Sequence, residues 1–413
     1  MCALTHNREG NDVTEIAIPY GGYWASPFAK WQGKLAHLHS LRFAAHVAKH
    51  SLERRGIAPT VFDFGVLGMT VPQKQSFYGL PWLMAEIGAD RVTGPTINQA
   101  CATSARILET ASSEIASGHS TVALAIATDR TSNGPHVYYP APAGPGGTGD
   151  HEDWVLDNFS HDPYAKVAMI ETAENVARRY QVTTAEQNDV VVRRYEQYAD
   201  ALADDSAFLK RFMELPFPVP DVRFKKSITE LHGDEGVHPT SAEKLRALKP
   251  VMADGTVTFG TQTHPADGTA AAILTTPDKA RELSRDPKIA IRILGIGQAR
   301  VEKGYMPEAP VPAARAALAA AQVEISEITA IKSHNPFIVN DIVFARSFGV
   351  DAMAMNNYGC SLVWGHPQGP TGLRAIIELI EELVLRGGGL GLFHGCAAGD
   401  TAMSVVISVE DAP

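Results

Sequence analysis

The stretch VTGPTINQACATSARILETASSEIASGHSTVALAIATD, residues 92–129, decides the fold class. It opens with a strand-like run, and small and apolar residues at helical spacing then extend from Cys101 to Gly118. It closes with TVALAIATD, residues 121–129, an apolar run that is typical of a buried strand. A strand, a helix and a second buried strand in this order predict an α/β fold with a layered sheet.

The same alternation continues on both sides of this stretch. Before it, the pattern predicts a helix at 38–56, a buried strand at 62–71 and a helix at 81–88. After residue 284 it predicts strands at 289–301, 327–335, 389–395 and 401–410, and helices at 313–323, 341–349 and 371–387. The chain is therefore expected to contain two α/β halves with a similar order of elements.

Between these halves the composition changes to proline, glycine and charged residues. The run SNGPHVYYPAPAGPGGTGDHED begins at residue 132, one long polar helix is predicted over 172–202, and residues 255–276 have strand, turn and helix character. We predict an N-terminal half formed by 1–130 and 251–283, an inserted loop domain at 131–250, and a C-terminal half at 284–413.

Composition excludes several classes of function. The chain has 413 residues and a formal net charge of -10, and it lacks a Lys or Arg run long enough to follow a nucleic-acid backbone. It also lacks an apolar stretch of about 18 residues and an N-terminal signal pattern, which predicts a cytoplasmic protein that binds no membrane. Its four cysteines, at 2, 101, 360 and 396, are far apart, so free thiols and no metal site are expected.

Cys101 is the first candidate for chemistry, because it stands between a strand-like run and the start of a helix. A thiol there is expected to feel the positive end of the helix dipole, which lowers its pKa and favours the nucleophilic thiolate. The other interpretation of such a residue is a small apolar side chain in the core.

Two glycine-rich turns carry the other candidates. In GHPQGPTGLR, residues 365–374, His366 is placed as a general base in a turn that leads into a long helix. In FHGCAAGDTAM, residues 393–403, Cys396 stands between two strands beside small residues whose backbone N–H groups are suited to an oxyanion hole. A loop histidine on the surface is the alternative for the first motif.

The order of these motifs along nearly the whole chain resembles the thiolase family. The resemblance rests on NQAC (98–101), TAENVA (172–177), GTVTFGTQTHPADGTAAA (255–272), SHNPF (333–337), GHPQGPTGLR (365–374) and CAAGD (396–400). It implies a five-layered αβαβα fold of two similar halves, with an inserted loop domain that covers coenzyme A. Coenzyme A is then a co-substrate, and no cofactor is bound permanently.

The resemblance also implies roles for particular residues. Cys101 would be acylated by a 3-oxoacyl thioester, His366 would activate it, and Cys396 would be the second acid/base. His334, with Asn335 beside it, would contact the thioester oxygen of the enolate, and backbone N–H groups at Cys101 and near Ala398 and Gly399 would bind the other oxyanion. A histidine at 334 resembles the sterol-carrier-protein-like branch of the family, whereas many members have asparagine there.

The sequence defines the residues that contact the substrate less clearly than it defines the residues for the chemistry. For the coenzyme A phosphates the basic candidates are Arg223, Lys225 and Lys226, although short charge runs are usually solvated surface. The candidates for the pantetheine and acyl tunnel are Met169, Thr263 and His264, and Trp154, Phe159 and Tyr164 are aromatic candidates for an acyl pocket. For the last three, an ordinary loop-domain core is the alternative.

The leading hypothesis is a 3-oxoacyl-CoA thiolase that works by a ping-pong route and forms a homodimer or tetramer. A ketosynthase-type condensing enzyme is a second hypothesis, against which Cys396 argues, because ketosynthases generally use histidines there. A third is a thiolase-like subunit that acts only with a small zinc-containing OB-fold partner protein.

Overall fold

A computed structural model describes residues 15–411, so Cys2 lies outside the described part of the chain. Most of its strands join one eleven-stranded sheet with the order β13-β14-β15-β12-β1-β11-β6-β4-β5, to which β2 and β3 add by pairing with β11. The sheet has two parts, which meet at the short strand β1 (Ile16–Ala17).

The N-terminal part contains Cys101, between β5 and α3. Its other strands are β2 (Tyr23–Ala25), β3 (Ala29–Lys30), β4 (Phe64–Gly68), β5 (Thr96–Ile97), β6 (Val122–Arg130) and β11 (Ala266–Thr275), and its helices are α1 (Ser40–Arg55), α2 (Gly79–Ile87) and α3 (Thr103–Ala116). Helix α1 ends where Gly56 adopts φ 66°, as the sequence predicted from this glycine.

The C-terminal part repeats the arrangement. Its strands are β12 (Ile289–Arg300), β13 (Ile328–His334), β14 (Gly389–Ala397) and β15 (Thr401–Asp411), and its helices are α8 (Pro277–Leu283), α9 (Pro310–Ala321), α10 (Val339–Phe348), α11 (Ser361–Trp364) and α12 (Gly369–Leu385). Short 3₁₀ turns lie at Pro59–Val61, Ser76–Tyr78, Pro145–Gly147, Leu209–Arg211, Met306–Glu308, Ile325–Glu327 and Ala352–Ala354.

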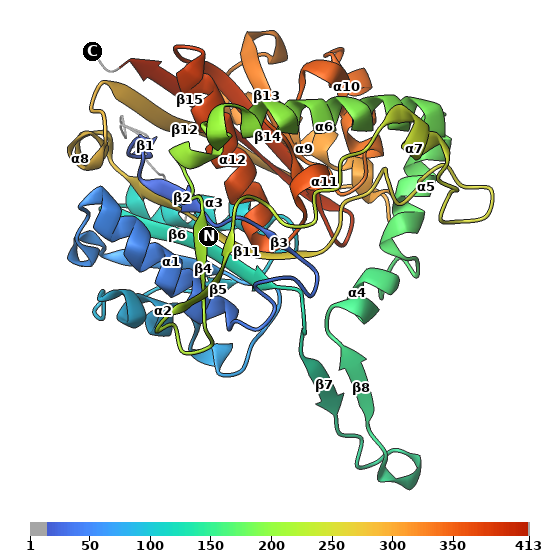
Figure 1. Ribbon diagram of the computed structural model, residues 1–413, viewed down its shortest axis with the longest axis horizontal. Coiled ribbons are helices and arrows are strands. Elements are labelled where there is room, and N and C mark those ends of the chain that lie inside the picture. Colours follow the sequence, from blue (N-terminus) through green and yellow to red (C-terminus); the bar gives the residue numbers. More distant parts are fainter. Residues whose placement is uncertain (1–14, 412–413) are drawn as a thin grey trace, which may run out of the picture.

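Helices and sheets alternate in five layers (Figure 1). Helix α1 packs on β6 and β11 from outside, α2 packs on α1 and β4, and α9 covers β12 and β15 on the other outer side with α10 next to it. Helices α3 and α12 contact each other and lie between the two parts of the sheet. The predicted layered αβαβα fold is confirmed.

Residues 131–250 contribute no strand to the large sheet. They form the hairpin β7 (His136–Tyr139) and β8 (Asp150–Asp153), helices α4 (Leu156–Ser160), α5 (Met169–Tyr180), α6 (Thr184–Ser206) and α7 (Ala242–Arg246), and the hairpin β9 (Phe217–Pro220) and β10 (Ser227–Leu231). The β7–β8 hairpin projects from the body of the molecule (Figure 1). The domain boundaries drawn from the sequence stay predictions.

Two predicted elements differ from the structure. The polar stretch 172–202 is not one helix: Gln181 adopts φ 53° and ends α5, and Thr183 caps α6 by accepting a hydrogen bond from Glu186 N–H at 3.2 Å. The alanine run 270–272 lies in strand β11, not in a helix. Small side chains fit there because helices pack on both faces of that strand.

The core is centred on α12, whose residues are buried from Gly369 to Leu383. Its apolar side chains pack on β14 and β15 and on the N-terminal sheet. Within residues 15–411, no helix combines the length and the apolar character needed to cross a membrane.

Candidate active site

Cys101 occupies a strained turn between β5 and α3. The preceding residue, Ala100, has φ 44°, in the left-handed region that costs a non-glycine residue about 1–2 kcal/mol. Thr103 holds the turn, because its hydroxyl donates to Ala100 O at 2.7 Å and accepts from Gln99 N–H at 2.8 Å. The half-buried thiol lines the large cavity.

His366 stands next to this thiol, as predicted. Its Nε2 lies 3.1 Å from Cys101 Sγ, and its Nδ1 lies 2.7 Å from the hydroxyl of Thr371. In the tautomer that donates from Nδ1 to Thr371, the Nε2 lone pair faces the thiol and can take its proton. This is the geometry that a general base requires.

Close backbone packing brings the two residues together from opposite halves. Gly365 has φ 95°, and a Cβ there would lie 2.9 Å from both Ala266 Cβ and His264 Nε2. A Cβ on Gly372 would lie 2.8 Å from Ser104 Cβ, so this glycine allows α12 to approach α3 closely. Ser104 also donates a hydrogen bond to Gly369 O at the start of α12.

Asp129, at the end of β6, connects the N-terminal sheet to the start of α12 through hydrogen bonds. Its carboxylate accepts hydrogen bonds at 2.8 Å from the backbone N–H groups of Thr70, Val71 and Gly369, and from the Thr70 hydroxyl. Burial raises the pKa of Asp129 to about 7, and these donors act in the opposite direction. The carboxylate thereby fixes the start of α12, and with it His366, to the N-terminal sheet.

His334 lies on the other side of His366. The two rings stack with centroids 4.1 Å apart, and His334 Nδ1 lies 2.9 Å from the Ser361 hydroxyl. Its Nε2 is buried and has no hydrogen-bond partner among the described residues. This side chain is fully buried and is not among the cavity-lining residues, so its Nε2 is a polar atom beside His366 without a partner in the described part of the chain.

Asn335 does not reach the cavity. Its side chain donates to Asp341 at 2.8 Å and accepts from Ser361 at 3.0 Å and from Leu362 N–H at 3.1 Å. Asp341 is in turn paired with the fully buried Arg194 at 3.0 Å. Asn335 thus supports Ser361 and, through it, His334, and the predicted oxyanion role is not available to its side chain.

Cys396 lies near the end of β14 and is fully buried. The side-chain amide of Asn340, on α10, donates to its sulfur at 3.2 Å. Burial raises the pKa of Cys396, and the neighbouring Cys101 raises it further. A hydrogen bond from Asn340 favours the thiolate, so it partly offsets these effects.

The prediction that the helix dipole lowers the pKa of Cys101 is wrong. Burial raises this pKa to about 12, although the backbone N–H of Ala398 lowers it. Burial also lowers the pKa of His366 to about 3 and that of His334 well below its usual value. The apolar surroundings disfavour both the thiolate of Cys101 and the imidazolium of His366. The resting pair is therefore a neutral thiol beside a neutral imidazole.

The two histidines are poorly arranged for a metal ion. Ligand atoms of Cys101, His334 and His366 lie within 4.8 Å of one another. A zinc ion lies about 2.0–2.1 Å from an imidazole nitrogen, along its lone pair in the ring plane. Because the rings are stacked at an interplanar angle of only 26°, their lone pairs run side by side and do not meet at one point. That the site uses no metal stays a prediction.

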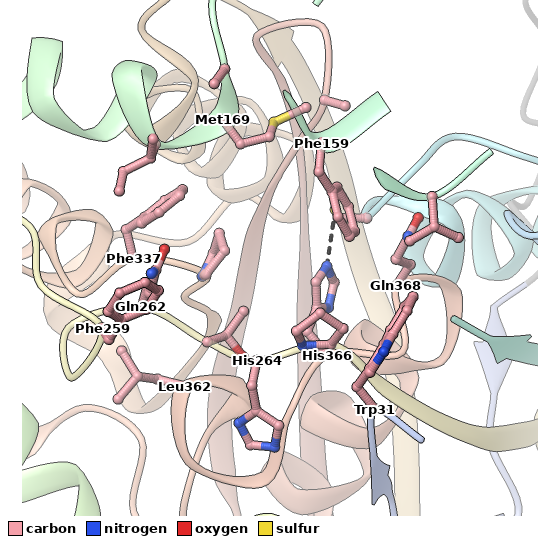
Figure 2. A pocket seen from close by; sticks show the side chains of 18 of the residues that line it. Trp31, Phe159, Met169, Phe259, Gln262, His264, Phe337, Leu362, His366 and Gln368 are labelled. Atoms are coloured by element: carbon pink, nitrogen blue, oxygen red, sulfur yellow. Dashed lines mark hydrogen bonds between the residues drawn. The ribbon is translucent and has the colours of Figure 1, made fainter. Parts of the chain in front are cut away.

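A cavity of about 1390 Å³ lies next to Cys101 and His366, which line it (Figure 2). It is lined by the predicted tunnel residues Met169, Thr263 and His264 and by Ala398 and Gly399. Trp154, Phe159 and Tyr164 also line it. All eight residues lie far from Cys101 in the sequence. The fold brings them to the cavity that Cys101 and His366 also line.

The basic residues predicted to hold the coenzyme A phosphates are elsewhere. Arg223, Lys225 and Lys226 lie in the turn between β9 and β10, where Phe224 packs on His46 and Arg42 of α1. They do not line the cavity, and their assignment to the phosphates stays a prediction. The cations that line it are Lys30, Lys244 and Arg300.

Sequence patterns missed four residues that hold the catalytic groups: Asp129, Asn340, Ser361 and Thr371. Thr371 lies within the quoted motif GHPQGPTGLR, five positions after His366, and that spacing was the signal available for it. The other three are brought in from separate elements, for which no local pattern exists.

Comparisons with known proteins agree with this geometry. The family model for the thiolase N-terminal domain matches residues 24–278, and the model for the thiolase C-terminal domain matches residues 287–409. Beta-ketoadipyl-CoA thiolase of Pseudomonas putida is 32% identical over 77% of this chain and 80% of its own. Acetyl-CoA acetyltransferase of Paracoccus denitrificans is 27% identical over 93% of this chain and 97% of its own.

Solved structures share the fold. Human mitochondrial 3-ketoacyl-CoA thiolase superposes with a TM-score of 0.86 at 24% identity, over 96% of this chain and 99% of that one. The Bacillus anthracis acetyl-CoA acetyltransferase superposes with a TM-score of 0.85 at 26% identity, over 97% of this chain and all of that one. Because family models match both halves, the chain belongs to the thiolase family of acyltransferases.

Proposed function

We propose that the protein is a 3-oxoacyl-CoA thiolase that cleaves its substrate with free coenzyme A through an acyl-Cys101 intermediate. The observation that supports this most directly is that Cys101 and His366 line one cavity, with the fully buried Cys396 close enough to Cys101 for its pKa to depend on that thiol. His366 lies 3.1 Å from Cys101, and the charge of Cys101 affects the pKa of Cys396. Cleavage next to a ketone needs a nucleophile and a proton donor, and these thiols supply one each.

In the first half-reaction, Cys101 passes its proton to His366 Nε2 as its sulfur adds to the C3 ketone of the substrate. The resulting alkoxide is bound by the backbone N–H groups of Cys101 and Ala398. When the alkoxide collapses, the C2–C3 bond breaks and its electron pair moves into a thioester enolate. Cys396 then protonates C2, which releases acetyl-CoA and leaves the acyl group on Cys101.

The enolate needs its own hydrogen bonds. His366, now protonated, can donate from Nε2 to the thioester oxygen. His334 Nε2 is buried without a partner beside it, and it can donate only in the tautomer protonated on Nε2, in which the Ser361 hydroxyl turns from Asn335 Oδ1 to His334 Nδ1. One such donor in a dry site typically contributes about 3–4 kcal/mol to lowering the barrier.

In the second half-reaction, the thiol of a new coenzyme A molecule attacks the acyl-Cys101 thioester. The proton of that thiol passes to the group that protonated the enolate, the Cys396 thiolate, and His366 returns its proton to the departing Cys101 sulfur. The shortened acyl-CoA leaves, and both cysteines are thiols again.

The proposal is tested by intact-protein mass spectrometry after mixing the protein with a panel of 3-oxoacyl-CoA esters without free coenzyme A. An acyl adduct is expected on the wild-type chain and not on Cys101→Ala. Its mass identifies the acyl group.

Cys396→Ser separates the two chemical steps. It should still accept an acyl group from a saturated acyl-CoA, because no carbanion forms and His366 can pass the Cys101 proton to the departing coenzyme A sulfur, and it should lose C–C cleavage of 3-oxoacyl-CoA. A wild-type chain that is acylated by saturated acyl-CoA but cleaves no 3-oxoacyl-CoA would favour a ketosynthase-type enzyme. No adduct until a partner protein is added would favour the partner-dependent hypothesis.

We further infer a cytoplasmic location and a homodimer or tetramer from the family resemblance. Gel filtration with light scattering, with and without a candidate OB-fold partner, tests the assembly. A monomer that is active alone would contradict this inference.

A further inference from the structure

The cavity over Cys101 is large for the transfer of a short acyl group. Its volume is about 1390 Å³, whereas typical ligand cavities span roughly 300–1,000 Å³. This cavity has to hold both the acyl group and part of coenzyme A, so the chemistry of its lining residues decides which acyl group fits.

Largely apolar side chains, together with the polar Gln262 and Gln368, flank the catalytic histidine on two sides (Figure 2). Trp31 and Gln368 lie on one side of His366, and Phe259, Phe337 and Leu362 lie on the other. Phe159 and Met169 form the part of the cavity opposite His366 in the same view.

Trp154 is a lining residue whose side chain is held in a fixed position by a hydrogen bond. Its indole N–H donates to Thr70 O at 2.9 Å, which satisfies the only polar atom of the ring. The apolar remainder of the side chain contributes to the cavity. Thr70 is also bound to Asp129, so this aromatic side chain is connected to the residues that position His366.

Large apolar side chains on the cavity lining are exposed to solvent. Phe259 is 74% exposed and Tyr164 is 64% exposed, and the others are Leu156, Leu248 and Val251. Apolar side chains that gather at one opening indicate a surface that a ligand covers.

We propose that the acyl group of the substrate is bulky and apolar, that is, larger than acetoacetyl and without a carboxylate at its far end. The inference rests on the proposed function, because it names the substrate class of the same site. Lys30, Lys244 and Arg300 are the cationic lining residues, and the phosphates of coenzyme A provide anions for them. A second carboxylate on the acyl group would be desolvated among the aromatic lining residues at a cost in affinity.

Four esters with the same coenzyme A part test the proposal: acetoacetyl-CoA, 3-oxoadipyl-CoA, 3-oxodecanoyl-CoA and 3-oxo-3-phenylpropanoyl-CoA. Their kcat/KM values in thiolysis are compared. For 3-oxodecanoyl-CoA or 3-oxo-3-phenylpropanoyl-CoA, kcat/KM should be at least tenfold higher than for both acetoacetyl-CoA and 3-oxoadipyl-CoA. Equal or better turnover of acetoacetyl-CoA or 3-oxoadipyl-CoA would overturn the proposal.

The affinity of the acyl-CoA esters for the unreactive variant Cys101→Ala can be measured without catalysis. Calorimetry should show tighter binding with each added methylene, up to about fourfold for one that becomes fully buried, and a more negative heat-capacity change. If no ester acylates the wild-type chain but this order of affinity holds, the proposed reaction fails and the substrate class stands. If affinity does not rise with apolar bulk, the substrate class is wrong whatever the activity.

Phe159→Ala and Phe77→Ala form a matched pair of variants. Phe159 lines the cavity, whereas Phe77 is 96% exposed and is not among the lining residues. The ratio of kcat/KM for 3-oxodecanoyl-CoA to that for acetoacetyl-CoA should fall at least fivefold in Phe159→Ala and stay unchanged in Phe77→Ala. Equal ratios in both variants would count against the proposal.

Discussion

His366 Nδ1 lies 2.7 Å from the hydroxyl oxygen of Thr371, five residues further along the chain. In the tautomer that donates from Nδ1 to this hydroxyl, the Nε2 lone pair faces Cys101. The orientation of the base therefore depends on a residue in the first turn of α12.

Thr371→Val keeps the shape of the side chain and removes this acceptor. The rate of Cys101 acylation should fall roughly tenfold or more, because losing a buried hydrogen bond costs about 1–3 kcal/mol, while the KM for coenzyme A changes little. Thr371→Ser retains the hydroxyl and should keep most of the rate. Stopped-flow measurement of acylation separates the two variants, and equal rates would show that the contact does not matter.

Asn340→Ala removes the hydrogen bond to the Cys396 sulfur. Because this bond favours the thiolate, the pKa of Cys396 should rise further and C–C cleavage should slow by about tenfold to a hundredfold. Acyl exchange between saturated acyl-CoA and coenzyme A should be nearly unaffected, because no C2 carbanion forms, Cys396 stays a thiol, and His366 alone carries the proton between the two sulfurs. A parallel loss of both activities would instead indicate general damage to the site.

The pH dependence of Cys101 alkylation tests the effect of burial on its pKa. With a pKa of about 12, the thiolate fraction rises about tenfold for each pH unit between pH 7 and 10. Iodoacetamide labelling at this position, followed by peptide mass spectrometry, should rise accordingly without a plateau. A plateau near pH 8 would show that a nearby group lowers the pKa.

The same shift has a consequence for stability. The pKa of Cys101 is raised on folding from about 9.0 to about 12, so its contribution is fully present below pH 9. It is lost as the pH rises toward 12, because the unfolded chain ionises first. Denaturant unfolding of the wild-type chain should therefore lose more stability between pH 8 and 10 than unfolding of Cys101→Ala, and equal losses would contradict this.

Asp234 anchors the segment before α7 to the core. It receives two hydrogen bonds from the buried Arg374, at 2.5 and 2.6 Å, and one from the Tyr198 hydroxyl at 2.7 Å. Asp234→Ala leaves a buried guanidinium without this partner and should lower the free energy of unfolding by about 3–5 kcal/mol. Asp205→Ala, which breaks the exposed pair with Lys210, should leave unfolding in urea unchanged.

Lys244 should contribute to coenzyme A binding, because it lines the cavity from α7. Lys244→Ala is expected to raise the KM for coenzyme A about threefold to tenfold, through loss of a solvent-screened contact to phosphate. Lys225→Ala and Lys226→Ala, in the β9–β10 turn, serve as charge-matched controls and should have no effect. A larger effect of either control would support the assignment made from the sequence.

The sequence alone determined the alternation of strands and helices and the family, because both depend on local periodicity and on the order of motifs. Cys101, His366 and Cys396 were identified because each stands in a turn of small residues at an element boundary. A glycine such as Gly56 ends its helix wherever the fold places it, so such boundaries can be predicted.

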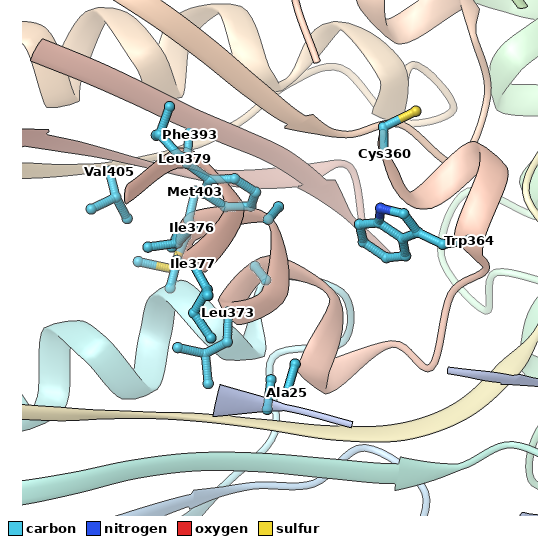
Figure 3. Close-up of a cluster of buried hydrophobic side chains, with 14 of the residues drawn as sticks. Ala25, Cys360, Trp364, Leu373, Ile376, Ile377, Leu379, Phe393, Met403 and Val405 are labelled. Carbon is cyan, nitrogen blue, oxygen red and sulfur yellow. The ribbon is translucent and has the colours of Figure 1, made fainter. Parts of the chain in front are cut away.

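The tertiary structure decided what depends on neighbours far along the chain. The alanine run of β11 became a strand because two helix layers close on it. Helix α12 is enclosed by both parts of the sheet, with Ala25 of β2 on one side and Phe393 of β14 and Met403 of β15 on the other (Figure 3). Burial raises the pKa of Cys101, against the backbone N–H groups of Ala398 and Cys101 that lower it, and this burial exists only in the folded chain. Asn340 and Thr371 reach their partners only after folding, and Lys225 and Lys226 fail to reach the cavity for the same reason.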